Sequence, residues 1–299
     1  MGALDGKVAV VTGAGRGIGR AEALLLAEHG AAVVVNDLGG EWDGTGKDDR
    51  PAQQVVDEIT EAGGRAAANY EDISSWKGAE ALVQQAVEEF GTLNVLVNNA
   101  GILRDAMLFN MTEAEWDAVV AVHLRGHAAT SHAACAWWRE RSKAGEHVIG
   151  RIVNTSSESG LYGLKGQANY ASSKAGIAAL TQVTAREMKK YGVTANCIAP
   201  RARTRLITQT FGEGMMAAPE GEDAFDVFAP ENVAPLVAFL ATDAAAHITG
   251  QAFLVFGGTV TLMKPWTAGP SIERERRWSV EDLDGEIGKL FTEHPSTIE

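Results

Sequence analysis

The stretch KVAVVTGAGRGIG, residues 7–19, decides the fold. Its first half is an almost continuous apolar run, which is typical of a parallel strand buried on both faces. Its second half has the glycine spacing of a loop that leads from a strand into a helix and lets the backbone approach a pyrophosphate. The free N–H groups at the start of that helix favour phosphate oxygens. We expect cofactor contacts from the loop residues Gly13, Arg16, Gly17, Ile18 and Gly19.

Outward from this stretch, short β-branched runs alternate with longer helical patterns as far as residue 260. One helix is expected to begin at Thr112, because Thr112 and Glu115 have the spacing of a capping box. This alternation is typical of an α/β protein, so we predict a Rossmann-type doubly wound parallel sheet with helices on both faces. The strands are expected at residues 7–12, 31–37, 65–70, 93–99, 150–156, 193–199 and 252–256.

The same pattern divides the chain. Residues 1–260 are expected to form a single dinucleotide-binding catalytic domain, and the long connection at 200–230 within it is predicted to be a substrate lid. Residues 261–299 are expected to be a C-terminal extension with a short amphipathic helix after Ser279, docked on the body or on a second subunit. The apolar lid residues could line an acyl or steroid pocket, or belong to the core; they are Phe211, Met215, Met216, Phe225 and Phe228.

Composition excludes several classes of function. A net charge of -13 argues against a nucleic-acid partner. The chain shows no signal-peptide pattern, no apolar run long enough to cross a bilayer and no peroxisomal address at its end. Cys135 and Cys197 are expected to be core residues in a reducing cytosol, and no Cys/His cluster has the spacing of a metal site. We therefore expect a cytoplasmic protein without a metal.

Two carboxylates follow predicted strands and bear on the choice of cofactor. Asp37 lies about 20 residues beyond the glycine loop, where a carboxylate can hydrogen-bond ribose hydroxyls and repel a 2′-phosphate. This favours NAD over NADP, although Arg16 could instead pair with that phosphate. Asp72 could accept a hydrogen bond from the adenine amino group, or serve only as a charge at a helix N-terminus.

A phenol and an ammonium share one helix face in QANYASSKAG, residues 167–176. Tyr170 and Lys174 are four residues apart, and Ser157 lies at the end of the fifth predicted strand. Because ligands bind beyond the carboxyl ends of parallel strands, all three side chains can reach one end of a bound dinucleotide. An adjacent cation is expected to lower the pKa of a tyrosine, which otherwise titrates near 10, so that it can act as a base. Ser157, Tyr170 and Lys174 are the predicted catalytic residues.

These motifs resemble the short-chain dehydrogenase/reductase family over about residues 5–260. The matching residues are TGAGRGIG, the NNAG stretch at 98–101, Ser157, Tyr170 and Lys174. The resemblance implies a homodimer or homotetramer without a metal. It also implies cofactor contacts from Asn99, Tyr170, Lys174 and Thr204. His123 takes the place of an asparagine that completes a proton relay in the family, and it could either relay protons or merely pack.

A closer resemblance narrows the substrate. VVVNDLGG, NNAGILRD, VHLRG and SGLYGLKGQANY are similar to the (3R)-hydroxyacyl-CoA dehydrogenase units of peroxisomal multifunctional enzymes of type 2 and their bacterial relatives. An acyl-CoA substrate is thereby implied. We interpret Arg201, Arg203 and Arg205 as candidates for a CoA phosphate, for salt bridges to acidic neighbours or for the dinucleotide pyrophosphate. The alternatives are a hydroxysteroid dehydrogenase and a dinucleotide-binding protein without turnover.

Overall fold

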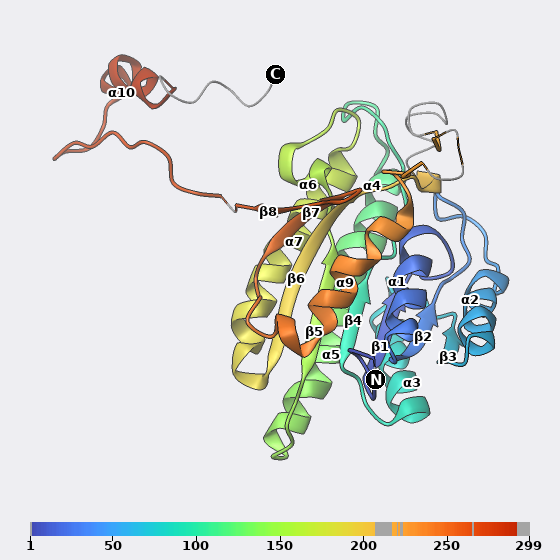
Figure 1. Ribbon diagram of the computed structural model, residues 1–299. Helices are drawn as coiled ribbons and strands as arrows, with labels where there is room; N and C mark the ends of the chain where they lie inside the picture. Colours follow the sequence, from blue (N-terminus) through green and yellow to red (C-terminus); the bar gives the residue numbers. More distant parts are fainter. Residues whose placement is uncertain (1, 207–216, 220, 222–223, 265, 292–299) are drawn as a thin grey trace. The chain divides into compact units, whose positions relative to one another are not determined.

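The computed structural model describes residues 2–206, 217–219, 221, 224–264 and 266–291 (Figure 1). The chain divides into two compact units, Met1–Met263 and Lys264–Glu299, which are described separately. Of the lid residues predicted to line a pocket, Phe211, Met215 and Met216 lie outside the described residues.

Within the described residues, eight strands form one sheet in the order β3-β2-β1-β4-β5-β6-β7-β8 (Figure 1). The first seven strands in the chain pair in parallel, and β8 pairs antiparallel with β7. The strand order reverses between β1 and β4, which opens a crevice at their carboxyl ends. The strands are β1 (Val8–Thr12), β2 (Ala32–Asn36), β3 (Arg65–Asn69), β4 (Val95–Asn98), β5 (Gly150–Thr155), β6 (Val193–Arg201), β7 (Ala252–Phe256) and β8 (Thr259–Met263).

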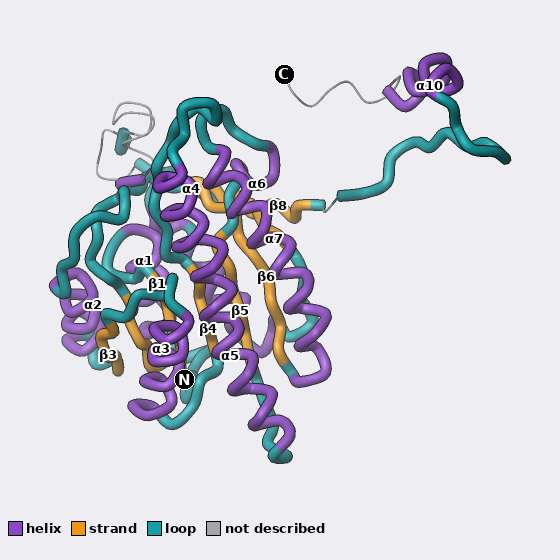
Figure 2. The backbone as a smooth tube through the Cα atoms, turned by 180° about the vertical axis from the view of Figure 1, so that it is seen from behind, coloured by secondary structure: helices purple, strands orange, loops and turns teal. Residues whose placement is uncertain are grey.

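Helices cover both faces of this sheet. The first face carries α1 (Gly17–Glu28), α2 (Arg50–Glu61) and α9 (Ala234–Ala241). The second carries α3 (Trp76–Phe90), α5 (Gly126–Lys143) and α7 (Ala168–Met188), which lie side by side in Figure 2. In β1, Ala9 and Val11 face the first layer while Val8 and Val10 face the second, so the strand is buried on both sides. The predicted doubly wound Rossmann-type fold is confirmed.

The helix predicted to begin at Thr112 is interrupted after two turns. Thr112 and Glu115 form the expected capping box of α4 (Glu113–Val120). A π-helical turn, Ala121–Arg125, then carries His123 and leads into α5. π-helical turns inside helices often mark functional positions, because the extra residue redirects a side chain.

Strand β8 was not predicted. Gly257 and Gly258 join β7 to β8 as a two-residue hairpin, and Gly257 adopts a positive φ of 51°. Two glycines between alternating apolar residues are a hairpin signal. Val260 and Leu262 of β8 are more than half exposed, so burial gave no reason to expect a strand there.

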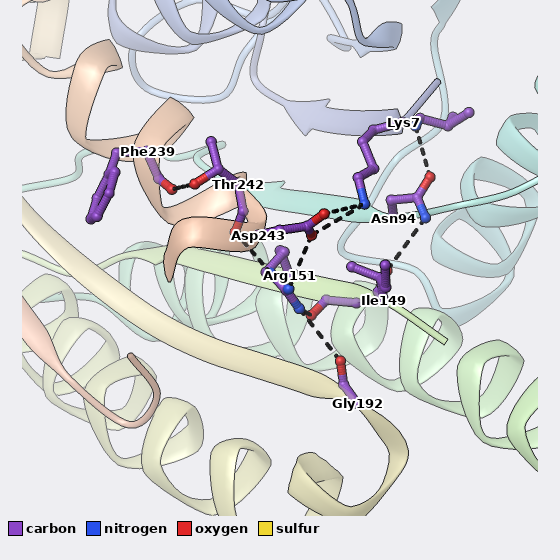
Figure 3. A network of polar contacts seen from close by, with 10 residues as sticks. Lys7, Asn94, Ile149, Arg151, Gly192, Phe239, Thr242 and Asp243 are labelled. Carbon is purple, nitrogen blue, oxygen red and sulfur yellow. Dashed lines mark hydrogen bonds and ion pairs between the residues drawn. The ribbon is translucent and has the colours of Figure 1, made fainter. Parts of the chain in front are cut away.

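An ion network ties the amino ends of the strands together (Figure 3). Asp243, in a 3₁₀ turn that follows α9, accepts from Lys7 before β1 and from Arg151 of β5. The Arg151 side chain is buried and also donates to the carbonyl of Gly192, just before β6. This end of the sheet lies opposite the crevice.

The second unit contains α10 (Val280–Glu286), which begins at the capping box formed by Ser279 and Asp282. The predicted start of this helix is confirmed. No helix in the described parts of the chain is both long and apolar enough to cross a membrane.

Candidate active site

A cavity of about 590 Å³ opens at the carboxyl ends of the strands. Eleven of the twelve residues predicted to bind cofactor or to act in catalysis line it: Gly13, Arg16, Gly17, Ile18, Asp37, Asp72, Asn99, Ser157, Tyr170, Lys174 and Thr204. The exception is Gly19, where a Cβ atom would lie 2.3 Å from the carbonyl oxygen of Gly13. Gly19 therefore lets α1 pack against the loop and need not touch a ligand.

The glycine loop has the conformation that its spacing predicts. Gly13 and Gly17 both adopt positive φ, 63° and 54°. A Cβ atom at Gly13 would come within 2.7 Å of the Cα atom of Ala100, so a larger residue would displace the turn. A Cβ atom at Gly17 would meet nothing closer than Thr204 at 3.7 Å, which leaves the backbone accessible from the cavity.

Asp37 is fixed against this loop by backbone hydrogen bonds. Its Oδ2 accepts from the N–H of Gly15 at 2.8 Å, and its Oδ1 accepts from the N–H of Gly39 at 2.7 Å. The carboxylate therefore has one orientation at the end of β2. Arg16, the residue before α1, lines the same cavity.

Asp72 and Asn99, which are also predicted to bind cofactor, have local partners as well. Asp72 accepts from both the N–H and the hydroxyl of Ser74, at 2.9 and 2.7 Å. Asn99 donates through Nδ2 to the carbonyls of Thr12 and Gly13, each at 3.1 Å, and so ties β4 to the glycine loop. Both side chains therefore stabilise the local structure, in addition to any contact with a ligand.

Tyr170 and Lys174 lie together on the first two turns of α7. The Lys174 Nζ atom lies 5.4 Å from the centre of the Tyr170 ring and donates to the carbonyl of Thr155 at 2.6 Å. Lys174 is 2% exposed, and burial lowers its pKa to about 7. Thr155 was not predicted, because the partner is a backbone carbonyl at the end of β5.

The phenol is not acidic in this arrangement. Burial raises the pKa of Tyr170 to about 12, the Ser157 hydroxyl lowers it in part, and Asp105 raises it. The described residues therefore do not produce the expected lowering of this pKa, because loss of hydration outweighs the hydrogen bond from Ser157. Ser157 is held at the start of α6 (Glu158–Tyr162), where its Oγ accepts from the N–H of Ser159 at 3.1 Å.

His123 packs edge-on against Tyr170, with ring centres 5.1 Å apart. Its Nε2 lies 3.1 Å from the nitrogen and 2.8 Å from the oxygen of Ile102. Burial lowers the pKa of His123 well below its usual value, so the ring is neutral. His127, one turn further, is fully buried as well and was not predicted to be near the site. The structure places His123 beside Tyr170 and leaves its role as relay or packing residue a prediction.

The three arginines after β6 pair with carboxylates from three parts of the chain. Arg201 pairs with Glu158, Arg203 with Asp226, and Arg205 with Glu41 at 3.1 Å. All three arginines also line the cavity. Of the interpretations open from the sequence, this arrangement supports salt bridges.

A comparison with protein families identifies the family of this chain. The family model of the short chain dehydrogenases matches residues 7–211. The chain belongs to the short-chain dehydrogenase family. It is therefore an oxidoreductase that acts on CH–OH groups, and its family generally binds a nicotinamide dinucleotide.

Individual relatives are consistent with this. The chain is 52% identical to the hydroxyacyl-CoA dehydrogenase ChsB1 of Mycobacterium tuberculosis over 300 residues, covering 96% of this chain and 89% of the relative. It is 43% identical to the peroxisomal multifunctional enzyme type 2 of Mus musculus, covering 86% of this chain but only 32% of that enzyme. A crystal structure of a short chain dehydrogenase from Mycobacterium avium matches with a TM-score of 0.86 and 49% identity, over 97% of this chain and 96% of that one. The predicted kinship with hydroxyacyl-CoA dehydrogenases is confirmed.

Proposed function

We propose that the protein is an NAD-dependent dehydrogenase that interconverts a (3R)-hydroxyacyl-CoA and the 3-oxoacyl-CoA. The observation that carries the proposal is a single cavity that joins Ser157, Tyr170 and Lys174 to the glycine loop and Asp37. The thioester class is supported by the names of relatives such as the hydroxyacyl-CoA dehydrogenase ChsB1.

The residues that line the cavity fit a nicotinamide dinucleotide. The backbone at Gly17 is open to the cavity, as noted, and the hydroxyl of Thr155 is buried there without a partner among the described residues. Gly13, Arg16, Gly17 and Ile18 would hold the pyrophosphate, Asp37 and Asp72 the adenosine, and Thr204 the carboxamide. When bound, the nicotinamide would accept the hydride that leaves the alcohol carbon.

Asp37 supports NAD rather than NADP. Its carboxylate is locked beside the glycine loop by two backbone N–H groups, so it cannot swing away from an added 2′-phosphate. A fixed negative charge there repels that phosphate and accepts hydrogen bonds from free ribose hydroxyls. Arg16 is the residue whose charge opposes this preference.

The side chains divide the proton chemistry between them. Ser157 donates a hydrogen bond that orients the substrate oxygen, and the Tyr170 oxygen accepts the hydroxyl proton. The form of Tyr170 that accepts this proton is the phenolate, which becomes a neutral phenol in the step. Lys174 stabilises that phenolate with its positive charge before the transfer. Because burial alone raises the pKa of Tyr170 to about 12, the phenol needs more positive charge than Lys174 supplies. A cationic ring next to it would supply this charge, which makes proton removal dependent on occupancy of the cavity.

The test is the formation of NADH with a panel of alcohols. The panel contains short, medium and steroid-derived (3R)-hydroxyacyl-CoAs, their (3S) isomers and free hydroxysteroids, each with NAD and with NADP. We expect turnover with (3R) thioesters and NAD. Turnover confined to free hydroxysteroids would overturn the substrate assignment. Tight NAD binding without turnover of any alcohol would overturn the assignment as an enzyme.

A further inference from the structure

A second cavity, also about 590 Å³, lies at the amino ends of β5 and β6, the end of the sheet opposite the active site. We call it the basal cavity. Its charged and titratable lining residues are His147, Arg151, Lys189, Asp243 and His247. Cations therefore outnumber carboxylates here, in a chain whose net charge is -13.

Arg151 is the buried cation of this cavity. It is 4% exposed, and its guanidinium donates to three carbonyl oxygens, those of Gly150, Gly192 and Thr242, at 2.9 to 3.4 Å (Figure 3). Carbonyls satisfy N–H groups but carry no net charge. These bonds therefore leave the positive charge of Arg151 to be balanced by a carboxylate.

The carboxylate that approaches Arg151 balances it only in part. Asp243 lies 3.4 Å from Arg151, its side chain is 63% exposed, and it is shared with Lys7 at 3.2 Å. Burial lowers the pKa of Arg151 more than Asp243 raises it, which agrees with an undercompensated charge. A buried guanidinium in this condition is stabilised by a further anion.

A buried hydroxyl without a hydrogen-bond partner among the described residues lines the same cavity as this guanidinium. Thr194 of β6 is directly opposite Arg151 of β5 in the sheet register, so both side chains project from the same face. Its Oγ1 is buried, lines the basal cavity and has no hydrogen-bond partner among the described residues. A hydroxyl and a guanidinium that line one cavity are donors that suit a tetrahedral oxyanion.

We propose that the basal cavity binds a phosphate group through Arg151, Thr194 and Lys189. The buried pair would contact the phosphate oxygens directly, while the exposed Lys189 at the rim would draw the anion in. The site is separate from the dinucleotide cavity, because none of its lining residues belongs to that cavity. Free phosphate and a phosphorylated metabolite share this chemistry.

Calorimetric titration with inorganic phosphate tests the proposal, in chloride buffer of matched ionic strength. Thr194→Val removes the hydroxyl at nearly constant volume, Thr194→Ser restores it, and Lys189→Ala removes the rim charge. Lys190→Ala removes the neighbouring lysine, which does not line the cavity. Arg16→Ala weakens any binding of phosphate at the glycine loop.

We expect saturable binding that falls by about tenfold or more in Thr194→Val and Lys189→Ala. Binding should stay close to that of the wild type in Thr194→Ser, Lys190→Ala and Arg16→Ala. Thr194→Val should unfold at the same temperature as the wild type without phosphate, or higher, because the lost hydroxyl has no partner. Absence of saturable binding, or binding lost only in Arg16→Ala, would overturn the proposal. AMP and a sugar phosphate, titrated in the same way, separate free phosphate from a phosphorylated metabolite.

Discussion

The chemistry of Tyr170 and Lys174 depends on both being buried. Burial favours the neutral form of each side chain. It raises the pKa of the Tyr170 phenol to about 12 and lowers the pKa of the Lys174 ammonium to about 7. Among the described residues, no carboxylate holds Lys174 in its charged form and no second cation holds Tyr170 in its charged form. Charge that arrives with a ligand would change both pKa values, so in the proposed reaction proton transfer depends on the bound state.

The role of Tyr170 predicts that Tyr170→Phe loses turnover by about 10²- to 10⁴-fold, the usual contribution of a positioned acid or base. NAD affinity should change little, because the ring and its packing against His123 are kept. Steady-state NADH formation and calorimetric NAD binding measure the two effects. Tyr162→Phe, at a tyrosine that is 64% exposed, serves as the matched control. A Tyr170→Phe enzyme with more than a tenth of wild-type turnover would exclude the phenol as the base.

A second prediction at the residue scale concerns Asp37 and the preference for NAD over NADP. Asp37→Asn keeps the size of the side chain and one acceptor oxygen but loses the charge that repels a 2′-phosphate. The ratio of kcat/KM for NAD to that for NADP should fall by about tenfold or more. Asp72→Asn, at the other carboxylate predicted to face the adenosine, should leave this ratio nearly unchanged. An unchanged ratio in Asp37→Asn would assign the preference to Arg16 or to another residue.

At the scale of elements, the hydrophobic pattern of the sequence predicted the strands that are buried in the sheet. The β1 and β2 runs are fully buried, and the nearly continuous apolar pattern placed them within one residue of their observed bounds. The helical pattern after Thr112 gave no sign of the π-helical turn at Ala121–Arg125. A π turn keeps apolar residues on roughly one face, so sequence spacing alone cannot distinguish it from a continuing α-helix.

Helix α1 carries a buried carboxyl group that the helical pattern did not single out. Glu22 is fully buried, and neither of its oxygens has a hydrogen-bond partner among the described residues. Burial raises its pKa to about 8 from an ordinary value of 4.5. Between these two pH values the folded protein holds a proton that the unfolded chain has lost. Below pH 4.5 this proton therefore does not change the free energy of unfolding. As the pH rises from 4.5 through 8, the free energy of unfolding declines.

Glu22→Gln is accordingly expected to match the wild type in unfolding free energy near pH 4.5. It should exceed the wild type at pH 8 by an amount on the order of 2–4 kcal/mol. Urea unfolding at several pH values measures the difference. Glu28→Gln, at the exposed end of the same helix, is the control and should show no such trend. Equal pH profiles for Glu22→Gln and the wild type would mean that Glu22 is ionised in the folded protein.

Across the whole molecule, the sequence predicted which residues come together at the cavity. It did not predict the ion pairs that hold some of them in position. The order of strands brings the glycine loop, Ser157 and Tyr170 to one edge, as expected for a doubly wound sheet. The carboxylate partners of the three arginines were not predicted, since Glu41 and Arg205 are 164 residues apart in the chain. Ion pairs between distant loops leave no periodic trace in a single sequence. The same applies to the contact between Arg151 and Asp243.

That contact gives a prediction for the entire sheet, because Asp243 links the segments that begin β1 and β5. In Asp243→Asn the buried Arg151 keeps its carbonyl partners and loses the carboxylate. The unfolding free energy should fall by about 1–3 kcal/mol, since the guanidinium is left without a countercharge. Chemical denaturation in chloride buffer free of phosphate measures the loss. Glu140→Gln breaks exposed ion pairs with Arg139 and Lys143 and should cost less than about 0.5 kcal/mol. A loss no larger in Asp243→Asn than in this control would show that the backbone carbonyls alone suffice to hold Arg151.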